Sequence, residues 1–116
     1  MAKLVIEIPD ELKDLGEALA TMVARVQDTV AGTGSGKAVD YARVERAIAE
    51  EAGGIERAAH RAILQALDID VPAVVIGGIR YTKVGRCEAP YHTLAGSVSI
   101  ERSLYRQSPP RAGSPG

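Results

Sequence analysis

The sequence has a single cysteine, no tryptophan, no phenylalanine and only four tyrosines among its 116 residues. One cysteine excludes an internal disulfide, and Cys87, His60 and His92 supply too few ligands for a four-coordinate zinc site. We therefore expect a reduced thiol at Cys87, and neither a metal nor a cofactor. Because aromatic residues are scarce, any core must be built from Leu, Ile, Val and Ala.

A long apolar run is also missing. No stretch approaches the roughly 20 residues needed to cross a bilayer, and residues 1–14 lack the apolar segment of a signal peptide. These absences predict a cytoplasmic protein without a membrane partner. A chain of 116 residues is typical of one domain and leaves no room for a second, catalytic domain, so we expect no enzyme activity.

The formal net charge of -1 conceals an uneven distribution. Residues 1–31 carry three basic and six acidic side chains, and residues 32–70 carry five and seven. Residues 71–116 carry six basic and two acidic side chains, a local charge of +4. A nucleic-acid-binding face is therefore expected in the last third of the chain, although this field is moderate.

An amphipathic helix is predicted from the beginning of the chain. Residues 3–8 are β-prone, and Pro9 and Asp10 are suited to begin a helix. Apolar residues then recur at alternating spacings of three and four, which form one helical stripe. This stripe follows a heptad, so it could pack against another helix. Packing against a helix of the same chain is favoured over packing against another copy. Its members are Leu12, Leu15, Leu19, Met22, Val26 and Val30.

A flexible Gly-rich linker is expected at residues 32–36. A second apolar series follows it, but Gly53 and Gly54 interrupt that series. Two adjacent glycines cost about 2 kcal/mol relative to alanine within a helix, so we predict a break or kink between two helices near 38–52 and 54–67.

After residues 68–72 the apolar period changes from that of a helix to that of a strand. Residues 73–76 and 79–84 flank Gly77-Gly78, which predicts a tight hairpin. A second hairpin is predicted from residues 91–95 and 98–105, with its turn at Gly96-Ser97. Val98, Ile100 and Leu104 would share one face of the last strand with Arg102.

These patterns predict an α+β fold. Residues 1–70 would be a helical region, in which a helical hairpin is one arrangement, with a short β-prone start and the linker at 32–36. Residues 71–106 would be a small antiparallel β-meander of two hairpins. Residues 107–116 are rich in Ser, Pro and Gly and are expected to be disordered.

Three local motifs favour ordinary structural roles. Residues 31–38, AGTGSGKA, resemble a phosphate-binding loop, but Ala31 and Ala38 replace its first Gly and its Ser or Thr, and a helix precedes it. His60 has no second metal ligand at helical spacing. Cys87 and His92 could form a nucleophile and base, but no third orienting group is identifiable, so their roles stay open.

Basic and aromatic residues alternate in the predicted sheet. Arginine and lysine suit phosphate contacts and tyrosine supports them, although an ordinary charged sheet face fits the composition equally well. The DNA-binding candidates are Arg80, Lys83, Arg86, Arg102 and Arg106, with aromatic support from Tyr81, Tyr91 and Tyr105.

Residues 64–106 resemble the N-terminal region of bacterial insertion-sequence transposases of the ISKra type. The helical segment before them, with Glu56-Arg57, is also similar to that family, so the likeness covers about two-thirds of the chain. The residues that carry it are Leu67-Asp68, Val75-Ile76-Gly77-Gly78, Tyr81, Arg86, Tyr91-His92-Thr93, Gly96, Val98, Arg102 and Leu104-Tyr105-Arg106.

The resemblance implies a metal-dependent carboxylate site further along in such transposases, where acidic residues hold magnesium for strand cleavage and transfer. Here the family-like pattern ends at Arg106 and a Pro/Gly/Ser tail follows. We therefore expect a truncated transposase front end that binds DNA weakly or helps to assemble a transposition complex, without catalysis.

Two other functions remain open. The first is a standalone interaction module that pairs through the helix from Leu12 to Val30, with itself or with a partner helix. The second is a ribbon-helix-helix DNA-binding regulator, since residues 4–12 have the outline of its strand and helix start. Against the second, the predicted helix of about 20 residues is too long, and such a domain needs no β-meander.

Overall fold

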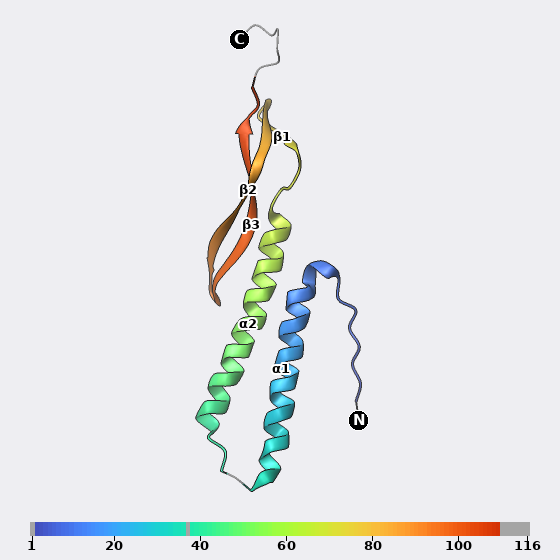
Figure 1. Cartoon of the computed structure of the whole chain (residues 1–116), viewed down its shortest axis with the longest axis vertical. Helices are drawn as coiled ribbons and strands as arrows, with labels where there is room; N and C mark the ends of the chain where they lie inside the picture. The colour runs from blue at the N-terminus through green and yellow to red at the C-terminus, as the bar shows by residue number, and fades with distance from the viewer. Residues whose placement is uncertain (1, 37, 110–116) are drawn as a thin grey trace.

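The computed structural model describes residues 2–36 and 38–109. Helices α1 (Lys13–Gly32) and α2 (Tyr41–Leu67) form an antiparallel hairpin, and three antiparallel strands follow. The strands are β1 (Ala73–Ile76), β2 (Ile79–Thr93) and β3 (Gly96–Gln107), in the order β1-β2-β3. The sheet lies beside the C-terminal half of α2, and α1 lies beside α2 from its N-terminus as far as Arg61 (Figure 1). The predicted α+β class, helices followed by a β-meander, is therefore confirmed.

Local interactions set the helix ends. A 3-10 turn, Asp10–Leu12, leads into α1, and the Leu12 N–H donates to the Pro9 carbonyl at 2.9 Å. The predicted linker is shorter than expected, because α1 includes Gly32 and a 3-10 turn, Thr33–Ser35, tightens its end. Gly36 then takes a positive φ of 78°. The second helix begins at Tyr41 rather than near 38, because the Asp40 carboxylate caps it by accepting from the Arg43 N–H.

Helix α2 is continuous through Gly53 and Gly54, so the predicted break into two helices is wrong. The two glycines are half-buried within α2, which packs against both α1 and β3. Packing on both neighbours offsets the propensity cost of two glycines. The missing Cβ of Gly53 also makes room for Arg57, whose Nη1 lies 3.0 Å from the position that a Cβ would take.

The first predicted hairpin is confirmed. Ile76 pairs with Ile79 across Gly77-Gly78, and both glycines have positive φ, 58° and 78°. Two central residues with positive φ characterise the tight turn that matches strand twist, and glycine adopts this conformation without strain.

The second hairpin differs from its prediction. Thr93 pairs with Gly96, so the turn lies at Leu94-Ala95 rather than at Gly96-Ser97, and both strands are longer than expected. The Thr93 hydroxyl closes this turn by donating to the Gly96 carbonyl at 2.7 Å and accepting from the Ala95 N–H. The glycine follows the turn because its φ of 115° is needed where β3 begins.

Few side chains are buried. Among the described residues only Val98, Ile100 and Ser103 fall in the buried class. Leu104 is 42% exposed, so the prediction that it shares the packed face with Val98 and Ile100 is wrong. The buried side of β3 changes between Ile100 and Ser103, because Ser103 is hydrogen-bonded to Asp68 and Asp70, which follow the end of α2.

The chain ends also depart from their predictions. Gln107 belongs to β3 and the Ser108 N–H donates to the Arg80 carbonyl at 2.9 Å, so the first residues of the expected disordered tail are part of the sheet region. Residues 110–116 of that tail lie outside the described residues. The β-prone residues 3–8 form no strand, and the side chain of Ile8 packs over Gly16.

Candidate nucleic-acid interface

Two of the five predicted basic residues lie in an ion-pair cluster where α2 meets the sheet. Lys83 donates to the carboxylate of Asp70. Arg86 lies 2.9 Å from Glu101 Oε2, 3.6 Å from Asp68 Oδ2 and 3.7 Å from Asp70 Oδ2. These cations neutralise carboxylates of the helix end and of β3, so the structure assigns Lys83 and Arg86 a role in the fold.

The neighbouring cations of this cluster lower the pKa of Asp70. The hydrogen bond from Lys83 lowers the pKa of its carboxyl below 3.8, and the charges of Lys83 and Arg86 act in the same direction. A lowered folded-state pKa means that the contribution of Asp70 to stability is fully present above the unfolded-state pKa and is lost as the pH falls through the folded value. At neutral pH the carboxyl group of Asp70 is therefore ionised.

The other three basic candidates lie together on one face of the sheet. Thr82 pairs with Arg106, and directly paired residues point to the same face. Arg80 lies two residues from Thr82 on β2, and Arg102 lies four residues from Arg106 on β3, so alternation places all three arginines on this face. We call Arg80, Arg102 and Arg106 the arginine face.

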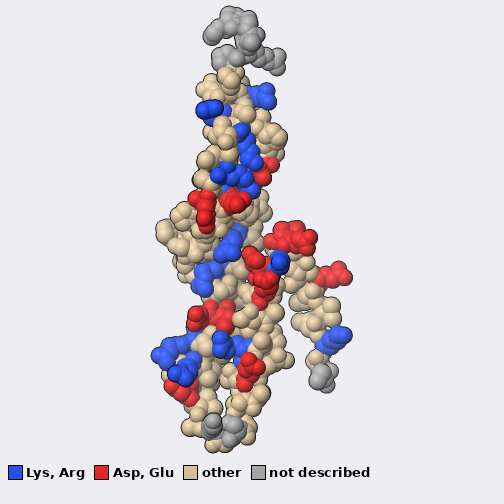
Figure 2. Space-filling model, in the orientation of Figure 1, with Lys and Arg blue, Asp and Glu red and all other residues tan. Residues whose placement is uncertain are grey.

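The arginine face is exposed and lacks acidic partners. All three arginines fall in the exposed class, and within the described parts of the chain none of them forms an ion pair. Figure 2 shows Lys and Arg side chains over the upper part of the sheet, with the acidic ones gathered lower, toward α2. Arg102 and Arg106 are about 13 Å apart along the strand, enough to reach separate phosphates.

The three tyrosines divide in a similar way. The Tyr91 hydroxyl lies 3.4 Å from Arg102 Nη1, so this ring supports the arginine face. The Tyr105 hydroxyl instead accepts from the Val71 N–H at 3.1 Å and lies 2.7 Å from the Ile69 carbonyl oxygen. Tyr81 is half-buried on the opposite face from Arg80. Tyr105 and Tyr81 are therefore not placed to support the arginine face.

Other candidate chemistry is not brought together. Cys87 and His92 lie five residues apart on β2, hence about 17 Å apart and on opposite faces. The His92 Nδ1 instead forms a hydrogen bond with the Ser97 hydroxyl at 2.9 Å. Over residues 2–36 and 38–109, no group of three or more His, Cys, Asp or Glu side chains could hold a metal ion. Lys37 of the Gly-rich motif lies outside the described residues.

The predicted pairing stripe of the first helix is divided between two surfaces. Leu12, Leu15 and Met22 are half-buried, whereas Leu19, Val26 and Val30 are 39%, 43% and 64% exposed. The favoured reading, packing within the chain, therefore holds for only part of the stripe. Val23, which is 58% exposed, was missed because it lies off the single stripe that the sequence suggested.

Sequence reasoning also missed the side chains that attach α2 to β3. Gln65 accepts from the Glu101 N–H at 3.0 Å and donates to the Glu101 carbonyl at 2.9 Å. The Asp68 carboxylate accepts from both the N–H and the hydroxyl of Ser103. No local signal could have indicated these pairs, because their members are 35 or 36 positions apart.

No family model, no curated protein and no solved structure matches the chain. Within the described residues, neither helix is both long and apolar enough to span a membrane.

Proposed function

We propose that this chain is a non-catalytic, DNA-binding part of a transposition system of the ISKra type. The observation that carries the proposal is the arginine face, three exposed guanidinium groups on one side of a sheet without a carboxylate partner among the described residues. Guanidinium groups bind phosphate oxygens through paired hydrogen bonds, and most protein–DNA hydrogen bonds go to the phosphate and sugar groups. The resemblance of residues 64–106 to the transposase front end supports DNA as the ligand.

The uneven charge of the chain favours the sheet as the contact. Residues 1–70 carry a net negative charge, which repels DNA from the helical hairpin. In the described parts of the chain none of those acids pairs with the arginine face, although Arg102 lines a shallow pocket together with Asp68, and Tyr91 supports the face through Arg102. Contacts to phosphates fix the position of a protein on the duplex but do not read the base sequence. Binding is therefore expected to be weak and to weaken further as the salt concentration rises.

The test compares two triple variants that change the net charge equally. The first replaces Arg80, Arg102 and Arg106 with glutamine. The control replaces Lys3, Arg43 and Arg46 with glutamine. These three residues are exposed and lie outside the sheet. Fluorescence anisotropy with a labelled duplex, measured at several salt concentrations, gives the dissociation constant and its salt dependence.

We expect the first variant to lose most of the binding and the control to retain it. Each phosphate contact that is lost lowers the slope of log K against log salt by about 0.9. An equal loss in both variants would show that only net charge matters, and unchanged binding in the first would refute the arginine face. Under a ribbon-helix-helix mode, deletion of residues 2–8 would abolish binding, whereas the proposal expects binding to persist.

A further inference from the structure

The helical hairpin leaves much of its apolar surface uncovered. Neither α1 nor α2 contains a buried residue. The radius of gyration is 22.6 Å, whereas a compact chain of this length has about 13 Å. The accessible surface is 9324 Å², roughly 3,200 Å² more than expected for a folded monomer of this mass.

Helix α1 carries two adjacent apolar stripes. The inner stripe includes Leu15, Ala18 and Met22, which are half-buried. The outer stripe is exposed and has spacings of four, three and four, the pattern of a helix that packs against another helix. It consists of Leu19, Val23, Val26 and Val30, which are 39%, 58%, 43% and 64% exposed.

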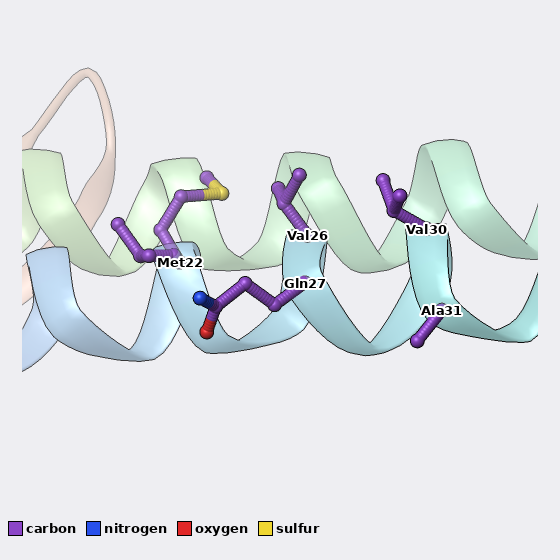
Figure 3. Close-up of a pocket in the computed structure, with 6 residues that line it drawn as sticks. Met22, Val26, Gln27, Val30 and Ala31 are labelled. Carbon is purple, nitrogen blue, oxygen red and sulfur yellow. The ribbon is translucent and has the colours of Figure 1, made fainter. Parts of the chain in front are cut away.

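A shallow apolar groove follows the outer stripe. Its volume is about 540 Å³, and Met22, Val23, Val26, Gln27, Val30 and Ala31 line it. Figure 3 shows Met22, Val26 and Val30 one turn apart along α1, with α2 behind them. No charged side chain lines this groove, so an apolar helix is a better occupant than a polar ligand.

We infer that a second copy of this chain covers the outer stripe, with the two α1 helices packed antiparallel about a twofold axis. A twofold interface uses the same patch on both chains, so the stripe must complement itself. If the axis passes between Ala24 and Arg25, Leu19 lies opposite Val30 and Val23 lies opposite Val26. Apolar residues then meet apolar residues along the whole stripe.

No charged residue of α1 lies near the outer stripe. At about 100° per residue, Glu17 and Asp28 lie on the opposite side of the helix from this stripe, so the paired stripes bury no charge. Arg25, beside the axis, is directed toward α2, because its Nη2 lies 3.2 Å from Glu51 Oε1.

The surface area supports a copy as the occupant. Obligate homodimer interfaces bury about 1,000–2,500 Å² per partner. The excess surface of the single chain includes the extended residues 2–9 as well as the hairpin, and a dimer through α1 would bury the part of it that belongs to the outer stripe. This inference does not depend on DNA binding.

Sedimentation equilibrium of the full chain tests the dimer. We expect a particle of twice the 12.2 kDa chain mass, and a monomer for Val26→Lys and for Val23→Glu, each measured alone. Each substitution puts an unpaired charge against valine in the homodimer. Leu94→Lys, at the fully exposed turn between β2 and β3, is the matched control and stays dimeric.

Mixing the two variants tests the register itself. In a mixed dimer the introduced lysine faces the introduced glutamate, while the second valine pair is retained, so we expect dimers in the mixture. Far-UV circular dichroism checks that each variant keeps its helices. A monomeric wild-type chain, or dimers of both single variants, would overturn the proposal, and a mixture that stays monomeric would refute the register.

Discussion

Arg57 connects a helix interior with a turn nearly 40 residues later in the sequence. Its Nη1 donates to the Ala95 carbonyl at 3.1 Å, and its Cδ lies 3.6 Å from where a Cβ on Gly96 would be. The same guanidinium group covers Gly53, which has no side chain to displace it. A glycine that looks like a helix breaker in the sequence therefore permits a tertiary contact.

The two glycines of α2 should consequently respond differently to alanine. At Gly54 the nearest side-chain atom is 3.9 Å from the added Cβ, so we expect Gly54→Ala to stabilise the fold by about 0.5–1 kcal/mol through helix propensity. At Gly53 the Cβ would lie 3.0 Å from Arg57 Nη1, so Gly53→Ala should gain less or destabilise. Urea unfolding followed by circular dichroism gives both values.

The Arg57→Ala background is the control for this comparison. Without the guanidinium group the two alanine substitutions should have equal effects, because only the propensity difference remains. Equal effects in the wild-type background would instead show that Arg57 does not constrain Gly53.

At the scale of elements, α2 protects one edge of the sheet. The outer edge of β3 would expose unpaired N–H and C=O groups, which invite pairing with other chains. Gln65 satisfies both backbone groups of Glu101, and Asp68 accepts from the N–H of Ser103. Side chains of a helix thus take the place of a fourth strand.

Asp68 is the member of this edge whose removal should be most costly. Its side chain is 7% exposed, and Asp68→Ala leaves the Ser103 N–H without its acceptor and Arg86 without one carboxylate. We expect a loss of about 2–3 kcal/mol in urea unfolding, and a smaller loss for Asp68→Asn, which keeps one acceptor oxygen. Glu45→Ala, on the exposed surface of α2, should change stability by less than about 0.5 kcal/mol. A similar small change for Asp68→Ala would contradict this assignment.

The elements also show what the sequence could predict. The Gly77-Gly78 hairpin and the apolar period of α1 depend on neighbouring residues, so both were predicted correctly. The kink in α2 was wrong, because packing by distant residues outweighs local propensity. For the candidate site, which stays a prediction, the sequence could not separate the three arginines that form no ion pair among the described residues from Lys83 and Arg86. The acidic partners of Lys83 and Arg86 lie outside their own strand, at residues 68–70, and on β3.

At the scale of the whole molecule, the two proposed surfaces are far apart. The chain measures 84 × 29 × 19 Å, with the sheet at one end and the α1–α2 loop at the other (Figure 1). An antiparallel pair of α1 helices would therefore direct the two sheets, each with its arginine face, toward opposite ends of the dimer. Such a dimer could contact two separate segments of DNA.

Salt should separate the two surfaces, because one is charged and the other is apolar. Raising the salt concentration from about 50 to 200 mM should weaken DNA binding about 40-fold if three phosphates are contacted. The dimer should stay within about twofold of its original affinity, since burial of valine and leucine does not depend on screened charges. Anisotropy and sedimentation on the same samples give both constants. If dimerisation weakened in parallel with DNA binding, charges rather than the outer stripe would hold the chains together; if neither changed, the arginine face would not be the contact with DNA.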